Sequence, residues 1–333
     1  MNRRLVYRVG QSGITIVSVF VFTFVLIRQM PGGPLSYLRG QLAAQGYSAE
    51  QINELAEVYL RIDPTQPLEV QLYDYVVGIL NGNLGRSTWY DEPVAGILAE
   101  ALPWTVFLMG TAMLLTFAIG ITLGAVMAYY EGSSFDVGST LTSVVLTSIP
   151  YYVVGLLMLA FLAYQNSYFP TGGRVGSTVE AGLTPAFVGS VLHHAALPIF
   201  SLVITGFGGW ALNMRGNSIR VLGSDYIRVA RLRGLKSRRI TLEYVGRNAI
   251  LPMYTFLLIS IGTVFGGAVI LETIFRYPGL GYYILEAVSA RDYPLLMGGF
   301  NLITVAVVLG VLFADLTYSR IDPRAGGEGN ESY

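Results

Sequence analysis

The chain has 333 residues, of which 53% are hydrophobic and 13% are charged. Soluble domains carry about 25% charged residues, so this composition, with apolar runs of about 20 residues, indicates an integral membrane protein. A net charge of zero gives no overall field for binding nucleic acid, and the absence of cysteine excludes disulfides and thiolate chemistry. The only histidines, His193 and His194, are adjacent and would diverge on a helix, so they suggest no metal site.

The first apolar run, from Val9 to Ile27, follows three arginines within residues 1–8. It is longer than the apolar region of a signal peptide, and the RQMPGGP that follows has no small-x-small cleavage site. We therefore interpret residues 1–30 as an N-terminal cytoplasmic segment and a retained first membrane-spanning helix. Prolines and glycines at 31–34 end this helix.

Residues 31–100 contain nine acidic residues against three arginines. Ser48, with Gln51 three residues later, forms a capping box, which predicts a helix from Ala49 to about Leu60. A second helix is predicted from Pro67 through Leu80, ended by Asn-Gly-Asn at 81–83. We predict an external, partly helical insertion that is too small and polar to be a catalytic domain.

Five further apolar runs predict an all-α fold with six membrane-spanning helices. The predicted spans run from Trp104 to Tyr130, from Val137 to Tyr164, from Ala195 to Met214, from Leu251 to Leu271 and from Met297 to Tyr318. External loops would cover 165–194 and 272–296. The membrane core is then 101–317, followed by a polar cytoplasmic tail at 318–333.

Small and hydroxyl residues mark two of the spans. Gly120 and Gly124 form a GxxxG pair, which favours close helix packing. The first half of the third span is rich in serine and threonine and ends at Pro150. These hydroxyls are expected to bond within or between helices. The alternative is a translocation path lined by Thr147, Ser148 and Pro150.

The distribution of lysine and arginine predicts that both termini are cytoplasmic, because the assigned cytoplasmic segments hold 14 of them and the external segments seven. Charges within the spans are nearly absent: Glu272 and Asp315 lie near predicted span ends, where hydration is available. An ion-driven carrier usually places ionisable groups at mid-membrane, so this pattern argues against a secondary transporter.

A basic loop at 215–252 holds nine of the 21 basic residues. Asp225 lies where a helix N-terminus favours negative charge, and Tyr226, Val229 and Ala230 would form an apolar stripe. Gly234 is expected to end this helix.

A second helix is expected to follow the glycine turn. Ser237 would cap it, and Ile240, Tyr244 and Val245 would form its apolar stripe. The composition allows an amphipathic hairpin on anionic lipid or a protein docking site, whereas nucleic-acid binding fits poorly because no folded module surrounds the loop. Lys236, the only lysine, follows Leu235 rather than the glycine of a P-loop, so the chain is not expected to hydrolyse ATP by that route.

The basic loop resembles the EAA loop of ATP-binding-cassette importer permeases, in the version of the B-type permease of the dipeptide/oligopeptide/nickel family. DYIRVARLRGLKSRR…GRNAILP is similar along its length, although the general consensus has an acid where this chain has Arg228. The remaining similar stretches are PGGP, GNLGRS at 82–87, SIPYYVVGLL at 148–157, FPTGG at 169–173, GGAVILETIFRYPGLG at 266–281, RDYP at 291–294 and DPR at 322–324.

This resemblance implies the type I importer permease fold, a second, C-type permease subunit, two cytosolic ATPases and an external substrate-binding protein. The chain would bind no cofactor, with ATP and Mg²⁺ held by the ATPases. Its basic loop would be the coupling element, with Ala230 and Gly234 as small residues at the turn and Asn248 and Pro252 leading back into the membrane. The candidate coupling positions are Asp225, Tyr226, Ala230, Gly234, Leu235, Ser237, Asn248 and Pro252.

The resemblance predicts half of a translocation path for peptides or similar small solutes, driven by separate ATPases. The alternatives are a membrane scaffold without a transport path and a secondary transporter. The solute itself is left open between peptides, nickel chelates, glutathione and oligosaccharides.

Overall fold

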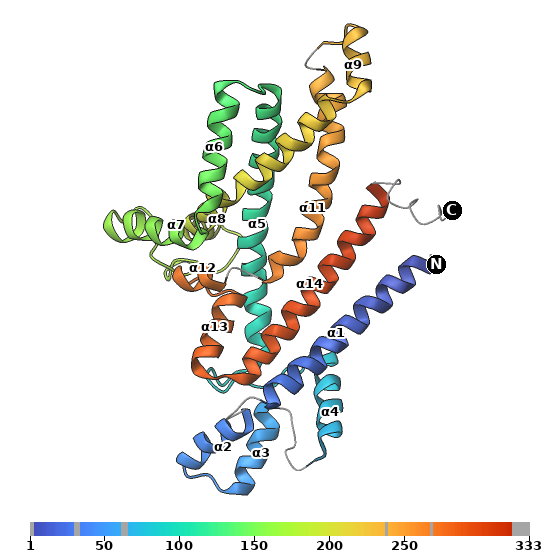
Figure 1. Ribbon diagram of the computed structural model, residues 1–333. Helices are drawn as coiled ribbons and strands as arrows, with labels where there is room; N and C mark the ends of the chain where they lie inside the picture. The colour runs from blue at the N-terminus through green and yellow to red at the C-terminus, as the bar shows by residue number, and fades with distance from the viewer. Residues whose placement is uncertain (1–2, 30–33, 61–65, 237–238, 267–268, 322–333) are drawn as a thin grey trace. The chain divides into compact units, whose positions relative to one another are not determined.

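The structure is a computed structural model that describes residues 3–29, 34–60, 66–236, 239–266 and 269–321. Within these residues the chain is built of helices, turns and one isolated β-bridge (Figure 1). The predicted all-α class is therefore confirmed.

The chain forms two compact units, each assembled from separate stretches of sequence. Unit 1 contains residues 1–105, 265–269 and 278–312, and unit 2 contains residues 106–264, 270–277 and 313–333.

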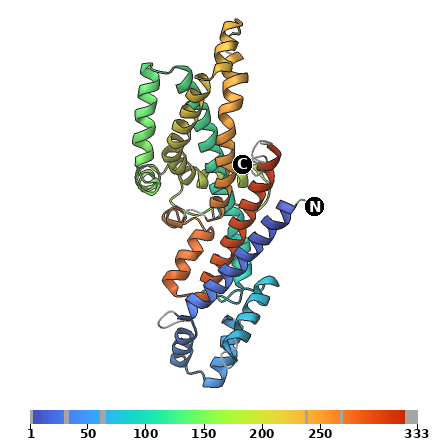
Figure 2. The same cartoon turned by 45° about the vertical axis from the view of Figure 1, so that its right-hand side comes forward.

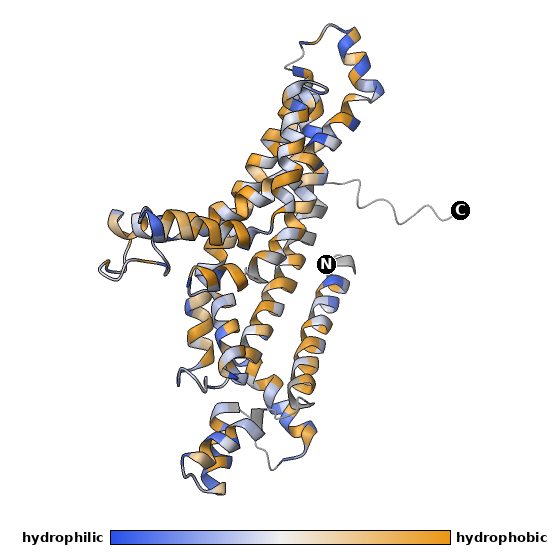
Figure 3. Ribbon diagram, turned by 60° about the vertical axis from the view of Figure 1, so that its left-hand side comes forward, coloured by the Kyte–Doolittle hydropathy of each residue, from blue (hydrophilic) through white to orange (hydrophobic). Residues whose placement is uncertain are grey.

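Five continuous helices are long and apolar enough to cross a membrane within the described residues, and they appear as mostly hydrophobic ribbons in Figure 3. They are α1 (Arg3–Gln29), α5 (Val94–Tyr129), α8 (Pro185–Leu222), α11 (Arg247–Gly266) and α14 (Tyr293–Ile321).

The predicted third span is wrong as one continuous helix. The chain forms α6 (Ser134–Ser148), then α7 (Tyr151–Met158) and the π-helical segment η1 (Leu159–Gln165), with a bend of 87° between them. Proline has no N–H and disfavours helical backbone at the residue before it, and Ile149 is extended with ψ 125°. The described chain therefore has five spans, or six if the bent pair counts as one.

Several predicted boundaries also need correction. Helix α5 begins ten residues before Trp104 and carries Pro103 in its interior, and α8 begins at Pro185, inside the predicted loop at 165–194. The α8 start has its own sequence signal, because the Thr184 hydroxyl accepts from the Phe187 N–H at 3.2 Å and proline occupies the first helical position.

The predicted external loop at 272–296 also contains helical structure. α13 (Leu280–Ala290) lies within it, and the short α12 (Val269–Ile274) replaces the predicted end of the fifth span.

The insertion after α1 is helical, as predicted. Helix α3 (Ala49–Leu60) has the expected reciprocal cap, in which the Ser48 N–H donates to Gln51 Oε1 at 2.9 Å and the Gln51 N–H donates to Ser48 Oγ at 3.3 Å. Helix α4 (Leu68–Leu80) follows Pro67 as predicted. The sequence reasoning missed α2 (Pro34–Ala44), which begins at the proline that was expected only to end α1.

Unit 1 has its main core where α5 begins. Val94, Leu98 and Ala101 of α5 are buried with Leu280 of α13 and Leu295 of α14. A smaller cluster joins α1, α4 and α14, and in it Asn301 Nδ2 donates to the Tyr75 hydroxyl at 2.7 Å. Burial raises the pKa of Tyr75 to about 12, so this hydroxyl stays neutral at physiological pH.

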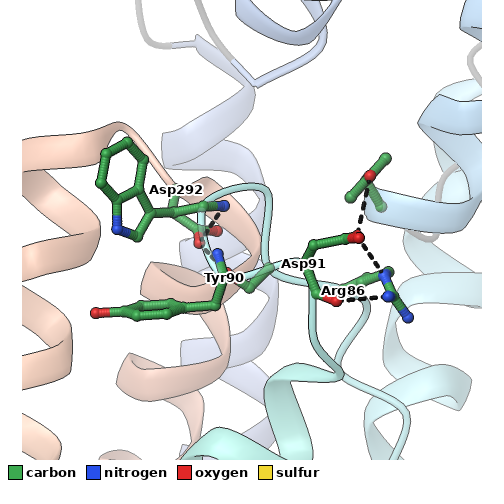
Figure 4. Close-up of polar contacts among 7 residues, drawn as sticks. Arg86, Tyr90, Asp91 and Asp292 are labelled. Atoms are coloured by element: carbon green, nitrogen blue, oxygen red, sulfur yellow. Dashed lines mark hydrogen bonds and ion pairs between the residues drawn. The ribbon is translucent and has the colours of Figure 1, made fainter.

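A buried carboxylate, Asp292, fixes the loop that precedes α5 (Figure 4). One carboxylate oxygen accepts from the Ser87 hydroxyl and from the Trp89 N–H at 3.2 Å, and the other accepts from the Leu295 N–H at 3.1 Å. Asp292 therefore caps α14 and holds the loop with the same side chain. This contact brings the GNLGRS and RDYP stretches together across the fold of unit 1.

The far side of the same loop is tied by Arg86. Its Nε donates to Asp91 Oδ1 at 2.7 Å, and the Tyr59 hydroxyl of α3 donates to the same oxygen at 3.2 Å (Figure 4). The hydrogen bond from Arg86 lowers the pKa of the Asp91 carboxyl. The pair therefore stays ionised to a lower pH than a free aspartate would allow.

We predict that Asp292→Asn loosens this loop. An amide has one acceptor oxygen for three donors and places an NH₂ group among them, so the expected loss is about 2 kcal/mol of folding free energy. The measurement is the rate of tryptic cleavage after Arg86, which should rise, together with the thermal unfolding midpoint, which should fall. Asp91→Asn is the control, because it breaks the solvent-exposed ion pair with Arg86 on the other side of the loop. It should lower the midpoint much less.

Unit 2 is organised by close contacts along α8. A Cβ built on Gly120 of α5 would lie 2.3 Å from Trp210 Cβ, and one on Gly124 would lie 2.3 Å from the Ala211 carbonyl oxygen. On another face of α8, a Cβ on Gly208 would lie 2.5 Å from the Ser143 carbonyl oxygen of α6. The predicted packing role of Gly120 and Gly124 is thus confirmed.

We predict opposite effects for two glycine-to-alanine changes in α5. Gly124→Ala forces α5 and α8 apart and should destabilise the protein by about 1–3 kcal/mol. Gly110→Ala meets no atom within 4 Å and should stabilise it by up to about 1 kcal/mol, because alanine favours helix. Thermal unfolding in detergent measures both changes, and equal shifts would contradict the packing argument.

Candidate functional site

The basic loop folds as a helical hairpin at the ends of α8 and α11 in both views of the ribbon (Figures 1 and 2). Helix α9 (Asp225–Leu232) begins after a two-residue turn that follows α8. The Ser224 carbonyl accepts the Ile227 N–H at 3.1 Å, whereas the Ser224 hydroxyl donates back to the Val221 carbonyl at 2.6 Å. Asp225 occupies the first turn of the helix, as predicted, where its charge favours the helix dipole.

One face of α9 is packed against its own unit. Ile227 is fully buried and Ala230 is 3% exposed, in a cluster with Met214 of α8 and residues of the returning chain. The predicted stripe of Tyr226, Val229 and Ala230 is therefore wrong, because only Ala230 of the three is buried. The buried face of α9 is instead formed by Ile227 and Ala230, which are three residues apart.

The other face of α9 is apolar and exposed. Tyr226, Val229 and Leu232 recur every three residues and are 44%, 53% and 81% exposed. Arg228, Arg231 and Arg233 are also exposed, and Figure 3 shows the mixed colouring of this helix. A row of exposed apolar side chains among charged ones on a helix is a candidate surface for contact with another molecule.

A glycine turn ends α9. The Gly234 N–H donates to the Arg231 carbonyl at 2.9 Å and the Leu235 N–H donates to the Ala230 carbonyl at 3.3 Å, which is the Schellman arrangement. Gly234 has φ +71°, as this motif requires, and a Cβ there would meet no atom within 4 Å. The predicted role of Gly234 as a helix-ending glycine is confirmed, and its surroundings within the chain are open.

The return to the membrane differs in detail from the prediction. Ser237 lies outside the described residues, so its predicted capping role stays a prediction. The next helical segment is η2 (Ile240–Gly246), which is π-helical, with Ile240 and Val245 buried and Tyr244 half-buried, as the predicted stripe requires. An exposed ion pair joins Arg239 Nε to Glu243 Oε2 at 2.8 Å.

Asn248 and Pro252 lie in the first two turns of α11. Asn248 Nδ2 donates to the Tyr244 carbonyl at 2.6 Å. Pro252 has no N–H for the Asn248 carbonyl, which removes one helical bond close to η2. The hairpin therefore joins α11 through two successive departures from regular α-helix.

The α8 segment before the hairpin is anchored by an ion pair that sequence reasoning missed. Arg215 Nε and its terminal nitrogen donate to the two oxygens of Asp136 at 2.6 and 2.7 Å, and the Gly132 N–H also donates to Asp136 at 3.0 Å. The Asp136 side chain is 2% exposed and that of Arg215 is 28% exposed. The sequence signal for this pair was that Asp136 directly precedes one apolar run and Arg215 directly follows another.

We predict that Asp136→Asn separates the start of α6 from α8. It leaves the Arg215 guanidinium without its bidentate partner, at an expected cost of about 2–4 kcal/mol, below the cost in a fully buried pair because Arg215 is partly exposed. The thermal unfolding midpoint measures the loss. Glu243→Gln breaks the exposed pair instead and should have little effect, and exchanging the two charges, Asp136→Arg with Arg215→Asp, should recover part of the loss.

The predicted path residues lie at the bend after α6. The Thr147 hydroxyl donates to the Ser143 carbonyl at 2.7 Å and the Ser148 hydroxyl donates to the Val144 carbonyl at 2.8 Å. Both hydroxyls therefore bond within their own helix, and Pro150 opens α7. Their role in a translocation path stays a prediction.

Three of the sequence stretches singled out above meet beside this bend, around Phe275. A Cβ on Gly155 has only 3.1 Å to the Phe275 ring, and the Gly173 N–H of FPTGG donates to the Phe275 carbonyl at 3.2 Å. Glu272 is fully buried here, so the expectation that hydration reaches it at a span end is wrong. The chain turns after α12, where the Tyr277 N–H donates to the Glu272 carbonyl at 2.7 Å, and the segments of Gly155 and Gly173 pack against Phe275 three residues further on.

Comparison with known proteins identifies the family of the chain. Residues 120–327 match the family model described as "Binding-protein-dependent transport system inner membrane component". The chain belongs to this family. It is therefore the membrane component of an importer, a transporter rather than an enzyme, and its apolar helices make it a multi-pass membrane protein.

Relatives match over nearly the full length. The chain is 33% identical to the oligopeptide transport system permease protein AppB of Bacillus subtilis, over 97% of this chain and 99% of the relative. It is 31% identical to the di/tripeptide transport system permease protein DppB of Pseudomonas aeruginosa, over 95% and 96%. It is 30% identical to the dipeptide transport system permease protein DppB of Escherichia coli, over 97% and 98%. The resemblance to the B-type permeases is thereby confirmed.

Proposed function

We propose that this protein forms half of the translocation path of an ATP-driven peptide importer and that α9 docks on a cytosolic ATPase. The observation that carries the proposal is the two-sided surface of α9. Ile227 and Ala230 fasten it to α8 and η2, while Tyr226, Val229 and Leu232 remain exposed among arginines.

A docking helix must transmit force between the ATPase and the membrane helices, and the two faces of α9 suit this role. Its buried face lets it move together with α8, and its exposed face offers apolar area and guanidinium groups to a partner with an apolar, acid-rimmed cleft. The open surroundings of Gly234 allow the turn to enter such a cleft. The partner ATPases would bind ATP and Mg²⁺, because the only lysine of this chain is not part of a P-loop.

The orientation follows from the same loop. We place both termini and the α9 hairpin in the cytosol, because nine of the 21 basic residues lie between Arg215 and Arg247. The acidic insertion at 31–100 then faces the outside. We assign 1–30 to the cytoplasmic N-terminus and first span, 101–317 to the membrane core and 318–333 to the cytoplasmic tail.

The other components of the system are a C-type permease, which would complete the path, and an external substrate-binding protein. We place Thr147, Ser148 and Pro150 at the path, since they lie at the bend between α6 and α7. Peptides are the proposed solute because the named relatives are permeases for oligopeptides, di- and tripeptides and dipeptides.

We predict that Gly234→Glu abolishes docking. A side chain at φ +71° strains the backbone by about 1–2 kcal/mol, and the carboxylate would extend from the turn that has to enter the cleft. Co-purification with the ATPases and ATP-dependent peptide uptake into proteoliposomes should both fall at least tenfold. Gly46→Glu is the matched control, because Gly46 has φ +90° and equally open surroundings but lies in the turn between α2 and α3.

Unchanged assembly and uptake in Gly234→Glu would refute the docking role of the hairpin. If the wild-type complex assembles but moves no peptide on ATP addition, the scaffold alternative is favoured. Uptake that survives ATP depletion and stops when the ion gradient collapses would instead favour a secondary transporter.

A further inference from the structure

Helix α7 and the π-helical segment η1 follow the bend after α6 as one helical segment, Tyr151–Gln165, which we call the α7–η1 segment. No charged residue occurs in it, nor anywhere between Val137 and Gly173. Figure 1 shows α7 leaving the end of α6 almost at a right angle, in accord with the bend of 87°. The segment is therefore as apolar as a membrane span but does not continue in the direction of α6.

One face of the α7–η1 segment packs against unit 2. Gly155, Leu159 and Ala163 recur every four residues and are buried. A Cβ on Gly155 would lie 3.1 Å from the Phe275 ring and 3.3 Å from Leu271 Cδ1 of α12. Small residues thus lie where this segment meets the rest of the protein, as is usual for helix contacts in membranes.

The opposite face is exposed and consists mainly of large apolar side chains. Close contact between membrane helices needs small residues, and Ala160 is the only small residue among the exposed ones of this segment. Lipid tails are as apolar as leucine and adapt to an irregular surface, so they suit this face better than a second helix does. The large side chains and their exposed fractions are Tyr152 36%, Leu156 49%, Leu157 53%, Phe161 56% and Tyr164 61%.

The level of the segment in the membrane follows from the length of α6. The ion pair of Asp136 and Arg215 marks one boundary of the hydrocarbon core, since ionisable side chains are rare within it. With α6 along the membrane normal, the rise from Asp136 to Ser148 is about 18 Å. The core is about 30 Å thick, so about 12 Å remains beyond the bend. A helix with its side chains is about 10–12 Å across, which matches the remaining depth for a segment that lies in the membrane plane.

Helix α8 places the second boundary independently. Its residues 195–214 contain no ionisable side chain and rise about 30 Å, the thickness of the hydrocarbon core. Arg215 follows this stretch at one end, and His194 precedes it at the other. The neighbouring His193 donates through Nε2 to the Tyr168 carbonyl at 3.0 Å, so the chain just beyond η1 lies at the second boundary. The α7–η1 segment therefore lies between the bend and that boundary.

We infer that the α7–η1 segment lies in the plane of the membrane, in the leaflet remote from α9, and that its exposed face binds lipid acyl chains. Tyr164 and Tyr168 are 61% and 66% exposed at the end of the segment nearest the polar loop, where tyrosine hydroxyls reach the headgroup region. Lipid contact along this face fixes the depth of the bend, and with it that of Thr147 and Ser148, the predicted path residues. Naming this leaflet the external one rests on the orientation in the proposed function.

The test uses single-cysteine variants of the full-length chain, which has no cysteine of its own. Leu157→Cys, Phe161→Cys and Tyr164→Cys are labelled with a bimane fluorophore and studied, in the assembled transporter, in nanodiscs whose lipids carry bromine at known acyl positions. We expect quenching at all three, with depths that agree within about 5 Å, because a segment that crossed the membrane would separate Leu157 and Tyr164 by about 10 Å. Leu141→Cys and Val145→Cys on the exposed face of α6 are the matched controls and should differ in depth by about 6 Å.

One more variant keeps the test independent of the large side chains. Ala160→Cys replaces a small exposed residue by another small one, which keeps the fold, and it should report the same depth. Depths about 10 Å apart for Leu157 and Tyr164, or quenching by aqueous iodide instead of brominated lipid, would overturn the inference. Quenching in the isolated chain that disappears on assembly would also overturn it, and would assign the face to the partner permease.

The orientation is tested separately. Leu183 is 98% exposed in the loop before α8, so Leu183→Cys should react with a membrane-impermeant maleimide added to intact cells. Reaction only after permeabilisation would reverse the orientation in the proposed function and leave the in-plane segment intact. Labelling of Leu183→Cys from outside, together with unequal depths along the α7–η1 segment, would remove the in-plane segment and leave the orientation.

Discussion

Helix α8 can run between its neighbours in unit 2 only because glycines lie where the helices meet. Gly120 and Gly124 bring α5 to within backbone distance of Phe207 and Ala211, and Gly208 does the same toward α6. In a membrane the hydrophobic effect does not drive helices together, so close van der Waals contact has to supply the association. The remaining features of unit 2, including the position of the hairpin, depend on this packing.

The consequence for α9 is mechanical. Arg215 joins α8 to α6 through Asp136, and ten residues later the chain enters the hairpin whose inner face packs back on Met214. These contacts give a displacement of α9 a route into α8 and, through the ion pair, to the start of α6. That helix ends at the 87° bend before α7, where the predicted path residues lie. A force applied at the proposed docking face would reach the proposed path through contacts that the structure contains.

The sequence predicted features that depend on local chemistry. The capping box at Ser48, the helix that ends at Gly234 and the glycine pair in α5 were all predicted from the spacing of a few residues, and all three are confirmed. Each is a case in which one residue type is favoured because of backbone geometry. The helical class followed in the same way from apolar runs of membrane-spanning length.

What the sequence could not predict depends on which faces meet. In α9, the spacing of Tyr226, Val229 and Ala230 suggests that these residues form the buried stripe. The buried face is instead set by Ile227 together with Ala230. The choice between these two faces depends on where α8 and η2 lie, which the local sequence does not specify. The same limit applies to Asp136 with Arg215 and to Ser87 with Asp292, which are far apart in the chain. Glu272 was misplaced for a related reason, because its burial comes from neighbouring segments that pack around Phe275.

The stretches that resemble the family also have a physical explanation. GNLGRS and RDYP meet at Asp292, and SIPYYVVGLL, FPTGG and the Phe275 segment meet beside α7. These contacts join loops to helix ends through the buried Asp292 carboxylate, backbone hydrogen bonds and glycines without room for a side chain. Few other residues would fit at these positions, so each short stretch restricts which residue types it can contain. They specify how the permease is built and would serve any solute. Selectivity among solutes is then expected to reside in side chains outside these junctions and in the separate binding protein.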